Sequence, residues 1–347
     1  MSPSARDAAF GSNPHCIPRA AVGPQERWLV AVALGGQGYY AAAAAELERL
    51  AADPAVPLRV AAHAAVTRAA HLRQLGGHAV ARSWDARGLR LATAAPVGPA
   101  QDDGTDVGAA LVGSAHGDGT DAGAARIAAS VGSAQDVGMD AGAARIDALV
   151  GLAADAVGLG DPAGAERLLA AAAPALATHP SWRPATRAGW VRAELALVRG
   201  TPAAAVAPAK GALAAARRGG SRRHVLKSRI VLAVAQSAAR VTTAEAAVTE
   251  LDAAAAECAG LGLLPLCWPA GLAALDLTRA PAAQPQIRIN DRVASTAGSA
   301  PGGRPDGTTR RRHAVRVALN VIEQRSDAVG KRQMGESVWI PQPATLM

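Results

Sequence analysis

The segment Gly160-Asp-Pro-Ala-Gly-Ala165 returns in outline as Gly200-Thr-Pro-Ala-Ala-Ala205, at a spacing of 40 along the chain. In both copies a glycine ends an alanine- and leucine-rich stretch, and a proline two positions later suits the first turn of the next helix. Gly38 and Gly76 interrupt two earlier stretches of the same kind, at a spacing of 38. A nearly fixed period of this length predicts stacked helical hairpins.

The composition agrees with helices packed through small side chains. Half of the residues are apolar, but only 3% are aromatic, and alanine dominates. Alanine has the highest helix propensity and allows close helix packing. Runs of β-branched and aromatic residues with period two are absent from the sequence. We therefore expect an all-α fold with essentially no sheet.

The spacing predicts about five antiparallel hairpins and a terminal capping helix within a repeat domain of residues 27–278. Where glycine is missing from the fifth turn, Arg240 follows Gly200 at the same spacing of 40, and Thr242-Thr-Ala-Glu245 predicts a capping box. The last helix covers the end of the stack, which has no further neighbour. The expected hairpins cover residues 28–50, 60–91, 144–176, 186–218 and 222–260, and the capping helix covers 268–277.

Residues 97–140 interrupt the pattern with Gly, Asp, Ser and Thr. The motif at 119–126 recurs at 138–145, so this segment is duplicated internally. Removing the segment would restore the spacing of 40 between Gly76 and Gly160. Since loop-closure entropy grows slowly with length, we interpret it as a duplicated, disordered loop insert.

Both ends of the chain are expected to be largely disordered. Residues 1–26 form a lead rich in Pro, Ser and Gly, and residues 279–347 form a basic tail with a short helix over 313–324. The tail holds eleven Arg or Lys against five Asp or Glu, which accounts for six of the eight net positive charges. The basic character therefore belongs mostly to the tail.

The sequence predicts a cytoplasmic protein without a membrane partner. No signal peptide is visible near the start, and the longest apolar run, 258–275, is interrupted by Pro265 and Pro269. Three cysteines without CxxC spacing favour free thiols over disulfides or a zinc site.

The hairpins resemble tetratricopeptide repeats. In the first hairpin Gly38, Tyr40, Ala43 and Leu47 occupy the family's glycine, aromatic, small and large positions. The resemblance implies a right-handed superhelix whose concave face holds a peptide. The third and fourth hairpins match through Gly160, Ala165, Leu169 and Ala172, and through Gly200, Ala205, Ala209 and Ala212.

The densest basic cluster lies between the fourth and fifth hairpins. With Ser221 as N-cap, Arg222 and Arg223 fall in the first helical turn, where the helix dipole disfavours cations. This placement predicts an anionic partner, such as a phosphate or an acidic peptide. The alternative is a solvated loop, or pairing with acidic residues elsewhere. The predicted partner-binding residues are Arg217, Arg218, Arg222, Arg223, His224, Lys227 and Arg229.

Other residues that can carry chemistry favour structural roles. His63, His71 and His78 lack the i, i+4 spacing of helical metal ligands, so we expect no metal. No nucleophile motif, P-loop or dinucleotide fingerprint occurs, so we expect neither catalysis nor a cofactor. Tryptophans are expected to anchor the core, or to form a binding hot spot if they lie on the concave face.

Together these features predict a non-catalytic scaffold that binds a protein or peptide, acidic in character, on a concave helical surface. The first alternative is a nucleic-acid-associated regulator that uses the 217–229 cluster and the basic run of Arg310, Arg311 and Arg312. The second is an enzyme with an unrecognised site, which the sequence supports least.

Overall fold

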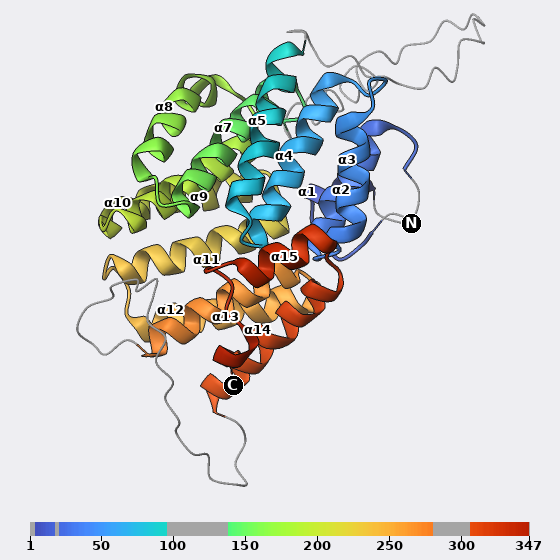
Figure 1. The fold of residues 1–347 in the computed structure, drawn as a ribbon. Helices are drawn as coiled ribbons and strands as arrows, with labels where there is room; N and C mark the ends of the chain where they lie inside the picture. Colours follow the sequence, from blue (N-terminus) through green and yellow to red (C-terminus); the bar gives the residue numbers. More distant parts are fainter. Residues whose placement is uncertain (1–3, 18–20, 96–137, 280–305, 347) are drawn as a thin grey trace, which may run out of the picture.

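The computed structural model describes residues 4–17, 21–95, 138–279 and 306–346, and within these ranges every regular element is a helix (Figure 1). The prediction of an all-α protein is confirmed for this part of the chain. The elements are α1 (Ala5–Phe10), α2 (Pro24–Gly36), α3 (Tyr40–Ala52), α4 (Leu58–Gln74), α5 (His78–Ala94), α7 (Ala141–Gly158), α8 (Pro162–Thr178), α9 (Trp182–Val198), α10 (Pro202–Arg218), α11 (Arg222–Ala238), α12 (Ala244–Gly260), α13 (Leu264–Arg279), α14 (Gly307–Gln324), α15 (Ala328–Glu336) and a 3-10 turn η1 (Pro343–Leu346).

Successive helices pack against each other, and the turns lie where the period places them. Gly38, Gly76, Gly160 and Gly200 have φ angles between 71° and 82°, which non-glycine residues rarely adopt. Arg240 adopts the same left-handed conformation with φ of 55°, so the spacing also identifies the turn that lacks glycine. The next helix is capped by Thr243, one residue later than the predicted capping box implies.

The predicted insert, 97–140, lies outside the described residues except for its last three. Asp140 is the N-cap of α7, and its carboxylate accepts a hydrogen bond from the Ala143 amide at 2.9 Å. The third hairpin therefore begins at the end of the duplicated segment.

The expectation of a disordered lead over 1–26 is wrong for residues 4–17 and 21–26. The short helix α1 ends at Phe10, which is buried against Trp28 and Trp182 at ring-centre distances of 5.7 and 6.5 Å. The Arg222 amide donates to the Gly11 carbonyl at 3.1 Å, so the N-terminus also contacts α11. A helix this short needs such tertiary contacts, because isolated short helices are unstable in water.

The expectation of a largely disordered tail is also wrong, for residues 306–346. The predicted helix at 313–324 is present but begins earlier, as α14, and α15 follows it. Val315, Leu319 and Ile322 are buried in one cluster with Tyr40 and Leu75 from the first two hairpins. The tail thus packs on α13, at the end of the helical body, and also on the start of that body, and Figure 1 shows α15 lying near α4. Residues 280–305 lie outside the described part.

Candidate functional site

The predicted basic cluster separates into groups that face different surroundings. Arg217 and Arg218 end α10 and are exposed. Arg222 and Arg229, on one face of α11, both bond to Glu257 on α12, at 3.0 and 2.8 Å. For these two arginines the structure shows the alternative that the sequence left open, pairing with acidic residues.

The remaining members, Arg223, His224 and Lys227, turn toward the interior of the protein. Ser221 is the N-cap of α11 as predicted, but its hydroxyl contacts His224 Nδ1 at 2.8 Å and caps no amide. Capping is therefore not the role of this side chain. It fixes the orientation of a buried histidine.

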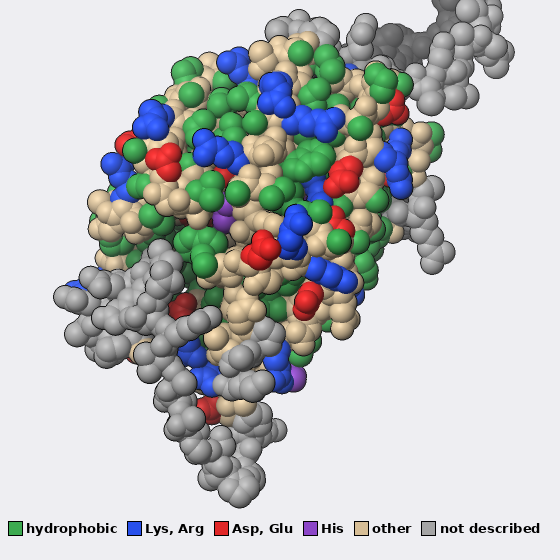
Figure 2. Space-filling model, in the orientation of Figure 1, with side chains coloured by type: hydrophobic (Ala, Val, Ile, Leu, Met, Phe, Trp, Pro, Cys, Tyr) green, Lys and Arg blue, Asp and Glu red, His purple; other side chains and the backbone are tan. Residues whose placement is uncertain are grey.

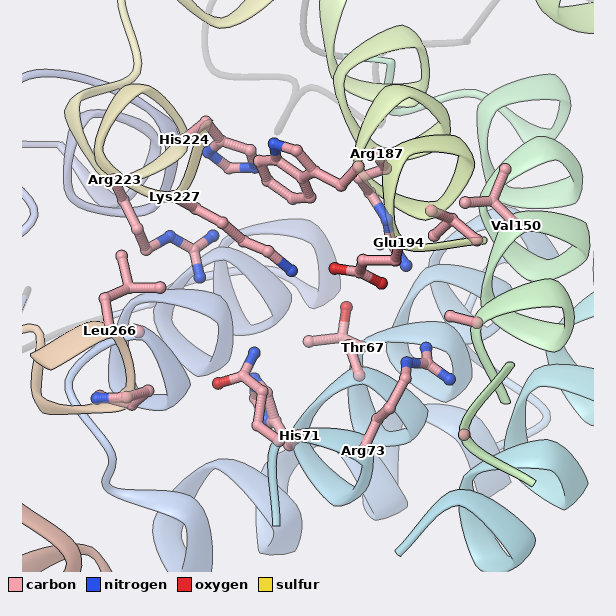
Figure 3. A pocket seen from close by; sticks show the side chains of 18 of the residues that line it. Thr67, His71, Arg73, Val150, Arg187, Glu194, Arg223, His224, Lys227 and Leu266 are labelled. Atoms are coloured by element: carbon pink, nitrogen blue, oxygen red, sulfur yellow. The ribbon is translucent and has the colours of Figure 1, made fainter. Parts of the chain in front are cut away.

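These three residues line a central cavity of about 470 Å³ (Figure 3). Most of the other lining residues come from the first helix of each hairpin, namely α2, α4, α7 and α9, whereas α3, α8, α10 and α12 contribute none. Two lining side chains, Val198 and Trp339, are also 43% and 36% exposed, so the cavity opens where they lie. Trp339 donates its indole N–H to the Gly158 carbonyl at 3.2 Å, which places the tail at this mouth.

Arg223 and Lys227 reach from α11 toward the centre of the cavity (Figure 3). Arg223 Nη2 lies 3.5 Å from the Ala9 carbonyl, and Lys227 Nζ lies 4.4 Å from the centre of the Trp190 ring. Neither forms an ion pair with a carboxylate in the described part of the chain. Burial lowers the pKa of Arg223 to about 10, so it remains protonated at neutral pH. Burial also lowers the pKa of Lys227, and the charge of Glu194 opposes this effect. We call Arg223 and Lys227 the cationic pair.

A third arginine of the cavity, Arg73, is instead held by buried carboxylates. Its Nη1 lies 3.0 Å from Asp85 and 2.5 Å from Asp155, and donates to the Gly151 carbonyl at 3.1 Å. Burial raises the pKa of Asp85 to about 8, and the neighbouring Asp155 adds to this effect while Arg73 opposes it. Burial therefore favours the neutral form of Asp85 although Arg73 lies beside it.

Asp147 holds two further arginines in the same way. The carboxylate is fully buried, bonds to Arg183 Nη1, and lies 3.4 Å from Arg187 Nε. Burial alone would raise the pKa of Asp147, but the charges of Arg183 and Arg187 outweigh it and keep the pKa below its ordinary value. The ion pairs keep this buried carboxylate charged.

The wall opposite the cationic pair is apolar. Val150, Ala154 and Val157 project from α7, and Val191 and Leu197 project from α9. Figure 3 shows Val150 across the cavity from Arg223 and Lys227. The site therefore has a cationic side and an apolar side, with Glu194 between them as the one acidic lining residue among the described residues.

The three histidines considered as metal ligands occupy separate packing sites. His63 stacks on Trp28 at 4.8 Å and contacts the Asp140 carbonyl at 3.1 Å, and His71 packs at 5.3 Å from Tyr40. His78 lies 3.6 Å from Asp155. Within the ranges that the structure covers, no group of three His, Cys, Asp or Glu side chains is placed to hold a metal ion.

Burial of His63 and His71 predicts a loss of stability in mild acid. Burial lowers the pKa of His63 to about 4 and that of His71 to about 3, whereas both titrate near 6.5 when unfolded. The unfolded chain therefore binds more protons, and stability falls as the pH drops from about 6.5 to about 4. For His63 alone we expect a loss of about 3 kcal/mol. Urea unfolding at a series of pH values measures it.

The matched variants for this measurement are His63→Gln and His313→Gln, because His313 is exposed. The first should make the pH dependence shallower, with the part due to His71 remaining, and the second should leave it unchanged. An equal slope in wild type and His63→Gln would show that His63 does not resist protonation in the folded state.

The sequence reasoning missed several residues of the site, among them the buried arginines on α9. Arg183, Arg187, Trp190 and Glu194 are spaced by four, three and four residues, which places them on one helical face. These residues could have been identified because they form a polar stripe on a helix that is expected to line the inner surface. Trp190 is one of the predicted tryptophan anchors and is also part of the cavity wall.

The outer surface shows mixed charge. Figure 2 shows Lys and Arg side chains interspersed with Asp and Glu over the face in view. In the predicted basic run of the tail, Arg311 forms two hydrogen bonds to Asp252, at 2.8 and 2.6 Å. None of the helices in the described ranges is long and apolar enough to cross a membrane.

No protein-family model matches the chain, and no curated protein sequence is similar to it. The cavity is therefore the feature of the molecule from which a function can be inferred.

Proposed function

We propose that this protein is a non-catalytic binding protein with tetratricopeptide-like hairpins, which holds a short anionic segment of a partner protein in its central cavity. The observation that carries the proposal is the cationic pair, Arg223 and Lys227, inside a cavity formed by alternate helices. Alternate helices of a helical repeat form its inner surface, and such surfaces commonly bind partners.

The size of the cavity favours a short segment over a folded surface. A volume of about 470 Å³ lies within the usual range for small ligands. An extended segment of a few residues suits this volume, whereas a folded domain cannot enter it. The opening at Val198 and Trp339 provides a path for a chain end or loop.

A regulator that binds nucleic acid is less well supported. Arg222 and Arg229 pair with Glu257, and Arg311 pairs with Asp252, so part of each basic run is neutralised. Duplex DNA would also need an exposed basic surface, because its phosphates cannot enter a cavity of this size.

Filling the cavity tests the proposal. Ala70 lines the cavity on α4, and a tryptophan there would occupy the space of a ligand. Ala171 is exposed on the outer helix α8, so Ala171→Trp is the matched control. Crosslinked capture from an extract of the source organism should recover a partner with wild type and Ala171→Trp but not with Ala70→Trp. Recovery of the same proteins by all three forms would contradict binding in the cavity.

A further inference from the structure

The charges around the central cavity do not balance. Five cations line it, namely Arg73, Arg183, Arg187, Arg223 and Lys227. Four carboxyls face them: Glu194 on the wall, and Asp85, Asp147 and Asp155 in contact with the arginines. The cations around the cavity therefore outnumber the carboxyls, and burial raises the pKa of one of these carboxyls, Asp85, which favours its neutral form. An anion bound in the cavity would offset this imbalance.

The cationic pair differs from the other three cations in its contacts. Arg73, Arg183 and Arg187 each lie 3.4 Å or less from a carboxylate, and two of them share Asp147. Arg223 and Lys227 form no ion pair among the described residues, and the nearest acidic side chain of the wall, Glu194, faces Lys227 (Figure 3). Arg223 and Lys227 are four residues apart on α11, so they project from the same face of the helix. One anionic group can therefore contact both.

Neutral donors complete the cationic side. Gln74 accepts a hydrogen bond from the Tyr40 hydroxyl through Oε1 at 2.6 Å, which leaves its amide N–H groups to donate. His71 is 3% exposed, lines the cavity, and its Nδ1 has no hydrogen-bond partner within the described structure. A buried polar atom without a partner is unfavourable, and a ligand oxygen or hydroxyl can satisfy it.

These features match a phosphate ester better than a carboxylate. A phosphate monoester carries a charge of about −1.5 to −2 near pH 7 and offers three acceptor oxygens. A carboxylate offers one charge and two oxygens. The arginine fork binds phosphate through two parallel hydrogen bonds, and a lysine adds a point charge. The apolar wall of α7 and α9 suits an aromatic or aliphatic body attached to the phosphate.

We infer that the central cavity binds a phosphate monoester, with its dianionic group between Arg223, Lys227 and Gln74 and its apolar body against Val150 and Ala154. This inference rests on the proposed function and names the anion of the bound segment as a phosphorylated side chain. A free organic phosphate has the same recognition chemistry, and the test separates the two sources.

Calorimetric titration of the full chain with three small probes tests which anionic group the cavity prefers. Phenyl phosphate, phenyl sulfate and benzoate share a ring but differ in charge and in oxygen count. Phenyl phosphate should bind at least about tenfold more tightly than the other two, since both carry a single charge. Equal binding of the three probes, or no binding of phenyl phosphate, would overturn the inference.

Substitution of Arg223 then tests whether the phosphate group contacts this residue. Arg223→Gln should weaken phenyl phosphate by about tenfold or more, because it removes a charge-assisted hydrogen bond. Arg222→Gln is the matched control, since Arg222 is on the same helix but exposed and paired with Glu257. An unchanged affinity in folded Arg223→Gln would overturn the placement. The comparison of the three probes on wild type needs no variant and remains decisive if Arg223→Gln does not fold.

Titration with a blocked phosphotyrosine peptide distinguishes a phosphorylated protein segment from a free organic phosphate as the natural ligand. Binding as tight as that of phenyl phosphate supports a phosphorylated protein segment. Much weaker binding of the peptide supports a free organic phosphate, and then the phosphate inference stands while the proposed partner role fails. Conversely, if Ala70→Trp abolishes partner capture but phenyl phosphate does not bind, the binding role stands and the phosphate inference fails.

Discussion

Replacing Asp147 by alanine will lower the free energy of unfolding by about 3–5 kcal/mol. Asp147 is fully buried and bonds to Arg183, which is itself only 3% exposed, while Arg187 approaches its other oxygen at 3.4 Å. Without the carboxylate, the Arg183 charge stays in the interior and loses its counter-charge. Removing one partner of a buried pair is far more damaging than losing a surface pair. Urea unfolding at neutral pH measures the change.

Glu257 provides the matched control. It also bonds two arginines, Arg222 and Arg229, but its side chain is 32% exposed. Glu257→Ala should therefore lower stability by less than about 1 kcal/mol. The pair of substitutions Asp147→Leu and Arg183→Met should recover part of the loss, because it removes the more deeply buried of the two unpaired charges and keeps apolar volume, while the less buried Arg187 stays unpaired. If Asp147→Ala matches Glu257→Ala, the buried network does not support the fold.

The helical hairpins could be predicted from the sequence because the residues that specify each helix and turn lie within the hairpin itself. A residue with a left-handed turn conformation is required where two antiparallel helices meet closely, and glycine meets this need at Gly160 and Gly200. The regular spacing even located Arg240, where the residue type gives no such signal. The alanine-rich composition predicted, from intrinsic propensity, that the described residues would form helices and no strands.

The structures of the two chain ends were predicted wrongly because contacts with residues distant in the sequence stabilise them. The short helix α1 has little stability alone, and Phe10 is ordered by Trp28 and Trp182. Helix α14 is largely polar, and its apolar stripe is covered by Leu275 of α13 together with Tyr40 and Leu75, which lie far earlier in the chain. No pattern within the tail shows that such partners exist.

The candidate site was predicted in part. The basic cluster contains the cationic pair, but neighbours on a helix point about 100° apart, so Arg222 and Arg223 face different surroundings. The sequence shows the charges without showing which face turns inward. The pairing of Asp147 and of Arg73 depends on contacts between hairpins, which spacing along the chain does not reveal.

Val315→Asp should detach the C-terminal helices from the body. Val315 is 1% exposed and lies against Gly271 of α13 so closely that a β-carbon on that glycine would lie 2.8 Å from it. An aspartate would bury a carboxylate without a counter-charge, which costs about 3 kcal/mol or more. Trypsin cleavage after Arg316 and Arg325 should then accelerate by about 100-fold, because cleavage follows local opening.

Val317→Asp is the control, since Val317 is on the same helix and is 45% exposed. The same change of residue there should leave cleavage close to the wild-type rate. Equal cleavage of Val315→Asp and wild type would mean that α14 is not held by α13 in solution. Because Trp339 of the same tail lies at the cavity mouth against Gly158, detachment also removes one wall of the cavity. A loss of phenyl phosphate binding in Val315→Asp but not in Val317→Asp would therefore connect the docked tail to ligand binding.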